Sequence, residues 1–289
     1  MKIIREITPL TQSDCFDITS RVVKELEDPV HYHDDFELHL IVNGKGAKRI
    51  VGGHTGELND LELVLIGSNI QHGWLNHKCK SKEIKELTVH FHKDLFGEQF
   101  LKRNQMSNLR KLFELAGQGV LFSQETIAKV VPRLQTLSTQ TGFASVIELM
   151  FVLHELSISK GFKTLSEGTF PKKPHGDVNR KLDKVFEYMN AHFSLQVTLK
   201  EVATIVAMSD ASFSRFIKHH TGYTFVDSLN EIRLKHVSRM LIDTTLSVSE
   251  IASRCGFNNM ANFNRTFKSK KGATPRAFRE THIGKNHFI

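Results

Sequence analysis

Residues 250–279 read EIASRCGFNNMANFNRTFKSKKGATPRAFR, and they repeat in outline residues 201–224, which read EVATIVAMSDASFSRFIKHHTGYT. The opening Glu-aliphatic-Ala triplet recurs 49 positions on, and a Phe-x-Arg-x-x-Lys pattern recurs 50 positions on. The second copy therefore carries one extra residue between the two patterns, where a turn can absorb it. Repeats with a period of about 20 to 50 residues usually indicate a duplicated structural unit. We expect the end of the chain to fold as two similar units.

Each copy has the pattern of a helix-turn-helix unit: an apolar helix, a short turn, and a second helix with polar outer positions. In the first copy, Ser209 is a suitable N-cap for the second helix, and Gly222 suits its C-terminal end. In the second copy, Gly256 lies in the turn, where a positive φ is often needed, and Asn258 or Asn259 is the expected N-cap. Two such units favour a nucleic acid as the binding partner.

The second helix of each unit is expected to turn its phenylalanines inward and a polar surface outward. Arg can pair with guanine and Asn with adenine, while Met or Ala can pack on the thymine methyl group. Lys is better suited to phosphates, which fix the position on DNA without reading its sequence. The outward residues expected to bind DNA are Ala211, Ser214, Arg215 and Lys218 in the first unit, and Asn259, Met260, Asn264, Arg265 and Lys268 in the second.

The basic charge of the chain is concentrated in the repeat region. The 289 residues carry a formal net charge of +8. Residues 171–289 contain 19 Lys and Arg against 10 Asp and Glu, whereas residues 1–170 contain 20 against 21. This asymmetry favours a polyanion as the partner of the C-terminal region, although a solvated basic surface would give the same count.

The cysteines and the apolar runs indicate where the protein is expected to act. Cys15, Cys79 and Cys255 are widely spaced and form no CxxC motif, which favours reduced thiols over a disulfide framework or a zinc ribbon. The N-terminal residues lack the apolar segment of a signal peptide, and no apolar run approaches the roughly 20 residues that span a bilayer. We therefore expect a cytoplasmic protein.

Residues 251–257, 263–268 and 272–279 together resemble the signature of the AraC/XylS transcription regulators, and the resemblance covers about 180–282. It implies two helix-turn-helix units joined by a long helix, here around 224–243. It also implies that two recognition helices enter successive major grooves on one face of double-stranded promoter or operator DNA, with RNA polymerase as a further candidate partner. By position, the implied readers are Ala211, Ser214 and Arg215 in the first unit, and Met260, Ala261, Asn264 and Arg265 in the second.

The preceding residues predict a separate domain of strands followed by helices. Residues 30–95 contain short β-rich runs between turn residues, which is typical of a sandwich or small barrel. Residues 97–160 change to the three-and-four spacing of amphipathic helices. The predicted fold is α+β with two domains: a first domain over 1–160 (β-barrel about 1–96, helices about 97–160), a linker rich in Gly and Pro over 161–178, and an all-α tandem helix-turn-helix domain over 179–289.

The histidines of the first predicted domain carry a second resemblance. His31, His33, Glu37 and Gly44 have the spacing HxH-x3-E-x6-G, and the later His72 begins an HxxxN pattern. These spacings resemble the two cupin motifs and imply a cupin-like β-barrel in the effector-binding and dimerisation domain over 1–160. Such a domain commonly precedes this DNA-binding module in regulators. Residues in alternate positions of a strand lie on one face of a sheet, so the first two imidazoles are expected to lie together.

The histidines leave two interpretations open. In a cupin enzyme His31, His33, Glu37 and His72 would hold a divalent metal, and their imidazole and carboxylate groups suit Fe, Mn, Ni or Zn. However, Gly67, Ser68 and Asn69 stand where this motif usually has proline and glycine. We therefore expect no metal or other cofactor. The expected function is a regulator, not an enzyme, whose effector pocket is formed by His31, His33, Glu37, His72 and Trp74; the alternative is a metal-dependent cupin enzyme with an appended helical domain.

The effector is expected to be a small molecule, with a sugar as one candidate. Trp74, the only tryptophan, could stack on a sugar face near a barrel mouth, although a single tryptophan more often serves packing alone. The run 143–160 is apolar over much of its circumference. It is expected either to be buried within its domain or to contact a second copy in a homodimer, in which case Leu149→Glu should break the dimer.

Overall fold

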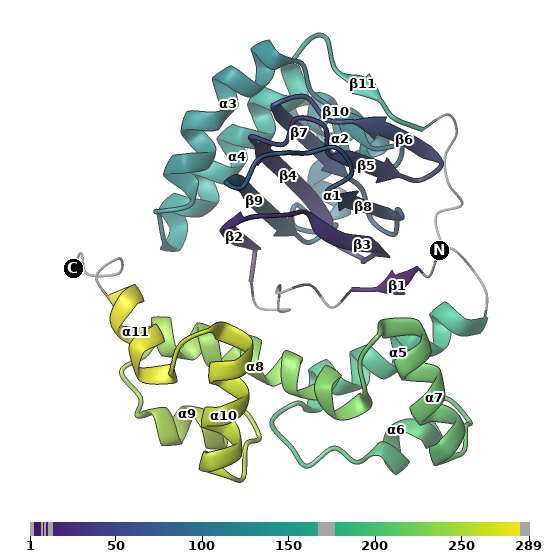
Figure 1. The fold of residues 1–289 in the computed structure, drawn as a ribbon, viewed down its shortest axis with the longest axis vertical. Helices are drawn as coiled ribbons and strands as arrows, with labels where there is room; N and C mark the ends of the chain where they lie inside the picture. Colours follow the sequence, from purple (N-terminus) through teal and green to yellow (C-terminus); the bar gives the residue numbers. More distant parts are fainter. Residues whose placement is uncertain (1–2, 7, 9, 11–13, 167–176, 284–289) are drawn as a thin grey trace. The chain divides into compact units, whose positions relative to one another are not determined.

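The computed structural model describes residues 3–283 except 7, 9, 11–13 and 167–176. The chain divides into two compact units, Met1–Pro174 and His175–Ile289. The first unit is rich in strands and the second is helical, so the prediction of a two-domain α+β fold is confirmed (Figure 1). Among the described residues, no helix is both long and apolar enough to cross a membrane.

The strands of the first unit form two sheets. One sheet has the strand order β1-β3-β8-β5-β6, and the other has the order β11-β10-β7-β4-β9-β2. The strands are β1 Ile4–Arg5, β2 Phe16–Val23, β3 Glu27–Tyr32, β4 Phe36–Val42, β5 Lys48–Val51, β6 His54–Glu57, β7 Leu61–Ile66, β8 His72–Leu75, β9 Ile84–Phe91, β10 Val120–Leu121 and β11 Lys163–Thr164.

Strand β4 lies at the centre of the larger sheet and is buried on both faces. Because side chains alternate along a strand, Leu38 and Leu40 join one core with the helices, whereas Ile41 joins a second core with residues of both sheets. Glu37 and His39 lie on the same face as Ile41, so they point into the space between the sheets. This alternation places polar groups inside the first unit.

Helices cover the outer face of the larger sheet. They are α1 Glu98–Leu101, α2 Ser107–Ala116, α3 Gln124–Leu137 and α4 Gly142–Ile158, with a short 3-10 turn at Asn104–Met106. Figure 1 shows α3 and α4 running side by side along one flank of the strands, where their buried residues share a core with those of β4 and β9. The predicted change from strand to helix after residue 96 is therefore present in the structure.

Helix α4 has a buried face and an exposed apolar face. Leu149 and Leu153 are fully buried in the helix–sheet core, whereas Phe143, Ile147 and Met150 are exposed. The expectation that Leu149→Glu tests a dimer contact is therefore wrong, because that change would place a carboxylate inside the core of the first unit. The exposed face remains available as a contact surface.

The structure also moves the boundary between the two units relative to the predicted linker. Residues 163 and 164 form β11, which pairs with β10, and Leu165 is buried in the core between the sheets. The chain thus belongs to the first unit through Ser166, and α5 begins at Asp177, within the predicted linker 161–178. The remaining residues of that segment, 167–176, lie outside the described residues. The start of this segment is held by backbone pairing between β11 and β10. The number of Gly and Pro residues in a sequence does not reveal such pairing.

The second unit consists of α5 Asp177–His192, α6 Leu199–Ile205, α7 Asp210–Thr221, α8 Phe225–Asp243, α9 Val248–Arg254, α10 Met260–Lys271 and α11 Pro275–Ile283. Helices α6 and α7 form the first helix-turn-helix, and α9 and α10 form the second. Helix α8 is the long helix expected around 224–243, and Figure 1 shows it joining the two helical groups. Each helix-turn-helix begins with a capping box, Thr198 with Glu201 and Ser247 with Glu250, which satisfies two N-terminal amides reciprocally.

Candidate functional site

The second helices of the two units, α7 and α10, begin and end as the sequence predicts. The Ser209 hydroxyl accepts a hydrogen bond from the amide of Ser212, and the Asn259 side chain accepts one from the amide of Asn262 at 2.9 Å. Both helices end at a glycine in the left-handed conformation, with φ of 80° at Gly222 and 73° at Gly272. The ends of both helices are thus fixed by side-chain caps and by glycines that need no Cβ.

The two helices turn the same kinds of residue inward and outward. Phe213 and Ile217 of α7 and Phe263 and Phe267 of α10 are fully buried. The residues predicted to bind DNA are all exposed to solvent: Ala211, Ser214, Arg215, Lys218, Asn259, Met260, Ala261, Asn264, Arg265 and Lys268. Each helix therefore presents an exposed face of polar, basic and small side chains with Met260 on α10, and such a face can dock into a major groove.

Two side chains on α10 make contacts that were not predictable from the repeat. Nη2 of Arg265 donates a hydrogen bond to Oδ1 of Asn262 at 3.0 Å, which holds the guanidinium along the exposed face. Nζ of Lys270 lies 3.6 Å from a carboxylate oxygen of Glu231 on α8 and 5.1 Å from the centre of the Tyr223 ring. Lys270 therefore contacts the body of the domain, in addition to any role toward phosphates.

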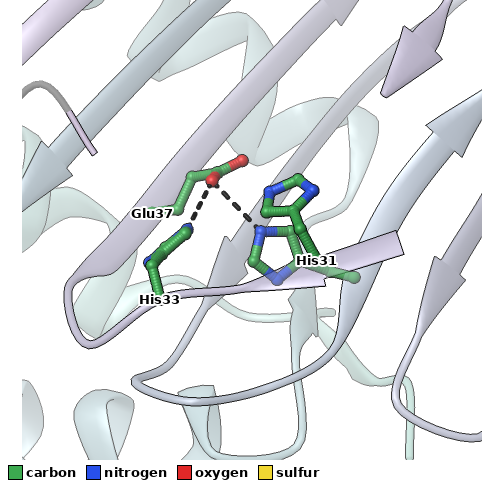
Figure 2. A group of neighbouring side chains, drawn as sticks. His31, His33 and Glu37 are labelled. Atoms are coloured by element: carbon green, nitrogen blue, oxygen red, sulfur yellow. Dashed lines mark hydrogen bonds and ion pairs between the residues drawn. The ribbon is translucent and has the colours of Figure 1, made fainter. Parts of the chain in front are cut away.

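In the first unit, one buried carboxylate is surrounded by four imidazoles. Nε2 atoms of three histidines lie close to Oε2 of Glu37, at 2.9 Å for His33, 3.2 Å for His72 and 3.2 Å for His90. Nδ1 of His39 lies 3.1 Å from Oε1 of the same residue. In Figure 2 the His33 ring points at the Glu37 carboxylate, and His31 lies beside them. We call Glu37 and its four imidazole neighbours the Glu37 cluster.

Strand pairing brings these distant residues together. His31 on β3 is the register partner of His72 on β8, and Glu37 on β4 is the register partner of His90 on β9. His33 follows the end of β3 directly, in the connection to β4. The structure thus brings together His31, His33, Glu37 and His72, the four residues singled out in the sequence. It adds His90 and His39, whose positions at period two along their strands were the available signal.

The cluster continues beyond Glu37 in two directions. On one side, Nε2 of His31 lies 3.0 Å from a carboxylate oxygen of Glu6, which follows β1. On the other side, Nε2 of His39 lies 3.4 Å from Glu86, and Nε of Arg21 donates to that carboxylate at 2.7 Å. The His31 ring adjoins the His72 ring of the cluster, with ring centres 4.3 Å apart, so a row of acidic and basic groups runs from Glu6 to Arg21 through the interior of the first unit.

The protonation states follow from this alternation. Burial by itself raises the pKa of the Glu37 carboxyl, but the imidazoles of His72, His33 and His39 outweigh burial and hold that pKa well below its usual value. Burial opposes the charge on His39, yet the nearby carboxylates of Glu37 and Glu86 raise its pKa to about 9. His31, buried but bonded to Glu6, likewise has its pKa raised to about 9. Burial lowers the pKa of His72 to about 4, so this ring is neutral at pH 7.

Trp74 occupies a different position from the one expected of a sugar-stacking residue. Its side chain is only 1% exposed and belongs to the core between the two sheets. The indole meets His39 edge-on, with ring centres 4.1 Å apart, and lies 5.7 Å from the His72 ring. Trp74 therefore packs against the Glu37 cluster from the core side and does not offer an open face at a barrel mouth.

The donor set of the cluster, taken together with the adjacent His31 and Glu6, is compatible with a metal ion. One ligand atom from each of His31, His33, Glu37 and His72 can be chosen so that all four lie within 4.8 Å of one another, and the same holds for Glu6, His33, Glu37 and His90. Imidazole nitrogens with one or two carboxylate oxygens suit Zn, Fe, Ni or Mn. The same groups can also donate and accept hydrogen bonds to a polar organic ligand.

Comparison with known proteins supports the assignment of the second unit. Residues 202–281 match the sequence model of a helix-turn-helix domain. The transcriptional activator RhaS of Klebsiella pneumoniae is 22% identical over 87% of this chain and 87% of its own length. RhaS of Salmonella arizonae is 33% identical over 36% of this chain and 37% of its own length. Of these two relatives, the one that matches about a third of the chain has the higher sequence identity, and the one that matches most of the chain has the lower.

A solved structure shares the fold over nearly the whole chain. The crystal structure of apo ToxT from Vibrio cholerae covers 94% of this chain and all of its own, with a TM-score of 0.50 and 14% sequence identity. At this identity the likeness concerns the fold alone. The family model covers the helix-turn-helix part of the chain, and the RhaS relatives above 30% identity match about a third of it, so the comparisons support a DNA-binding transcription regulator that resembles the AraC/XylS family.

Proposed function

We propose that this regulator binds a small-molecule effector at the Glu37 cluster and that the bound effector changes its affinity for operator DNA. The observation that carries the proposal is the cluster itself. Ionised and polar groups in a protein interior are costly unless they are paired, and apolar residues of similar volume would often stabilise the fold as well or better. A cluster of this size is therefore better explained by ligand binding than by stability alone.

The chemistry of the cluster favours a ligand with several hydroxyl groups, such as a sugar. The Glu37 carboxylate can accept hydrogen bonds, and imidazoles can donate or accept them according to their protonation. Because Trp74 is buried, recognition would rest on these polar groups and not on stacking. An effector acts only if it binds one arrangement of the chain more tightly than another, so a change in DNA affinity measures that preference directly.

The test combines melting and DNA binding on the full chain. A panel of sugars is screened for an increase in melting temperature, and each hit is added to a gel-shift titration with upstream DNA over a series of salt concentrations. We expect a hit to raise the melting temperature of the wild type and to change the DNA affinity, and we expect Glu37→Gln to lose both effects. Binding that falls with salt but ignores DNA sequence would contradict the regulator, because phosphate contacts alone give no specificity.

The second candidate function, a metal-dependent cupin enzyme, draws on the same residues. His31, His33, Glu37 and His72 would hold the ion, which would act as a Lewis acid toward a bound substrate. The ion must compete with protons, because His31 has its pKa raised to about 9 by Glu6 and a protonated imidazole cannot bind a metal. We therefore propose that the protein acts without a metal and is not an enzyme. Metal analysis of the purified protein tests this, and stoichiometric iron or manganese lost in His31→Ala would favour the enzyme.

We further propose that the protein acts as a homodimer joined through the exposed face of α4. Phe143, Ile147, Met150 and His154 follow one another at spacings of four, three and four residues, which is the seam of a coiled coil. A single helix with such a seam can pair with the same helix of a second copy around a two-fold axis. The dimer would act at promoter DNA in the cytoplasm. RNA polymerase would be a further partner there.

A further inference from the structure

The turns of the two helix-turn-helix units have the same backbone but not the same residue. Ala207 in the first turn and Gly256 in the second both have positive φ, 53° and 79°. Each donates its amide to the carbonyl three residues earlier, at 3.0 Å, to Thr204 and to Ser253 respectively. Since alanine adopts this conformation in the first turn, the conformation alone does not explain the glycine in the second.

The difference lies in what approaches the second turn. A Cβ atom on Gly256 would lie only 2.6 Å from the carbonyl oxygen of Phe193 and 2.9 Å from Nε of Arg233. Phe193 belongs to the loop after α5, which precedes the first helix-turn-helix. Ala207 is exposed to solvent. The second turn therefore serves as a contact surface for the first half of the domain, whereas the first turn does not.

Arg233, on α8, forms the centre of this contact. Its Nε donates a hydrogen bond to the carbonyl of Phe193 and its Nη2 donates one to the carbonyl of Leu195, both at 2.8 Å. Its guanidinium also lies 5.8 Å from the centre of the Phe257 ring, in the second turn. One side chain thus contacts the loop before the first unit, the connecting helix and the turn of the second unit.

The neighbouring side chains reinforce this junction. The Phe193 ring stacks on His236 of α8 with ring centres 3.6 Å apart, and it packs against the core that contains Phe257 and Phe263. On α10, Lys270 contacts Glu231 and Tyr223, as described above. The two helix-turn-helix units are therefore joined by specific contacts as well as by the continuity of α8.

We infer that Arg233 is a positioning residue that fixes the distance and angle between α7 and α10 and thereby sets the spacing of the two DNA subsites that the domain accepts. Successive major grooves on one face of DNA are about 34 Å apart, or about 10 base pairs. Inserting one base pair shifts and rotates one subsite relative to the other. A rigid pair of helices must distort itself or the DNA to follow, whereas a loosely joined pair adapts at little cost. The inference rests on DNA binding by the family and is independent of the effector.

The chain offers a matched control in Arg279. This arginine on α11 donates to the carbonyls of Leu241 and Leu246, at 3.1 and 2.6 Å, and so makes the same kind of contact. Those carbonyls lie at the end of α8 and before α9, within the second half of the domain. Removing Arg279 should cost stability without loosening the junction between α7 and α10.

The experiment uses the full chain and a duplex selected by the wild type from a random-sequence pool, with the two subsites located by footprinting. Affinities are measured for this duplex and for versions with one base pair inserted or deleted between the subsites. We expect the wild type to lose about tenfold or more in affinity on either change, and Arg233→Ala to lose only about two- to threefold from its own lower maximum. Arg233→Lys, which can still donate to one carbonyl, should fall between them.

Arg279→Ala should keep the full spacing penalty of the wild type while its melting temperature falls, as in Arg233→Ala. Equal relaxation in both arginine variants, or an undiminished penalty in Arg233→Ala, would overturn the inference. If Arg233→Ala fails to fold, Gly256→Ala provides the second measurement, because its methyl group must displace both the Phe193 carbonyl and the Arg233 side chain that donates to it. An unchanged spacing penalty in that variant would also count against Arg233 as the positioning residue.

Discussion

The Glu37 carboxylate shows how single residues shape the interior of the first unit. It is buried, yet it stays ionised because imidazoles contact both of its oxygens. The protonated imidazole of His39 depends in turn on the carboxylate, since a protonated imidazole without a partner is costly inside a protein. The cluster is thus stable only as a set, and removing its central charge should affect all of its members.

We predict that Glu37→Gln lowers the free energy of unfolding of the first unit by about 3–5 kcal/mol, the usual cost of removing one partner from a buried charged pair. Glu57→Gln is the control, because Glu57 is an exposed carboxylate paired with the exposed Lys78 at 3.1 Å. The control should change the stability by less than about 1 kcal/mol. Urea unfolding of both variants measures the difference, and similar losses would show that the cluster is not held by its central charge.

The exposed residues of α7 and α10 predict that the two units contribute unequally to the recognition of DNA sequence. The second unit offers Asn264 and Arg265, whereas the first offers Ser214 and Arg215 with small neighbours. Asn264→Ala and Arg265→Ala should each reduce discrimination between the selected DNA and random DNA by about 1–3 kcal/mol, and Ser214→Ala should reduce it less. Lys268→Ala should instead weaken binding to both DNAs. Competition gel shifts measure these ratios, and equal losses in all three variants would favour two equivalent readers.

At the scale of elements, the helices of the second unit were more predictable than the strands of the first. Their ends carry side chains that act locally, such as Ser209, Asn259 and Gly222, so a short sequence window contains the whole signal. In strand β2, by contrast, about half of the residues are exposed, and buried and exposed positions alternate only weakly. Strand β3 contains Pro29. These strands depend on pairing with residues far along the chain, which no short window contains.

Helix α4 carries the prediction for assembly. Ile147→Glu should convert the proposed dimer to a monomer, because it places a carboxylate in the seam and leaves the buried face of the helix unchanged. Val22→Glu is the control, since Val22 is an exposed apolar residue on β2. Sedimentation velocity distinguishes the outcomes. A dimer that survives Ile147→Glu, or a wild-type chain that sediments as a monomer, would remove α4 from the interface.

At the scale of the whole molecule, the sequence identified the kind of site better than its extent. The spacing of His31, His33 and Glu37 was enough to predict that these three side chains share one site. The inclusion of His90 follows from its register opposite Glu37, and that register is set by pairing of whole strands. In the same way, the repeat identified two DNA-binding units, but the contact between Phe193 and Gly256 became visible only in three dimensions.

Because the two units have separate cores, their stabilities should respond to different substitutions. Leu153→Ala removes a fully buried side chain from the first unit, and Ile217→Ala removes one from the second. Each should lower the unfolding free energy of its own unit by about 2–5 kcal/mol.

Calorimetry should therefore resolve two transitions, of which each variant lowers one. Adding the selected duplex at about 100 times its Kd should stabilise only the unit that Ile217→Ala destabilises. Its free energy of unfolding should rise by about 2.7 kcal/mol, because a ligand stabilises the unit that binds it. A single transition lowered equally by both substitutions would mean that the units unfold together. In that case an effector bound to the first unit would alter DNA binding through one cooperative structure. The alternative, in which the effector changes the placement of two independent units, would no longer explain the regulation.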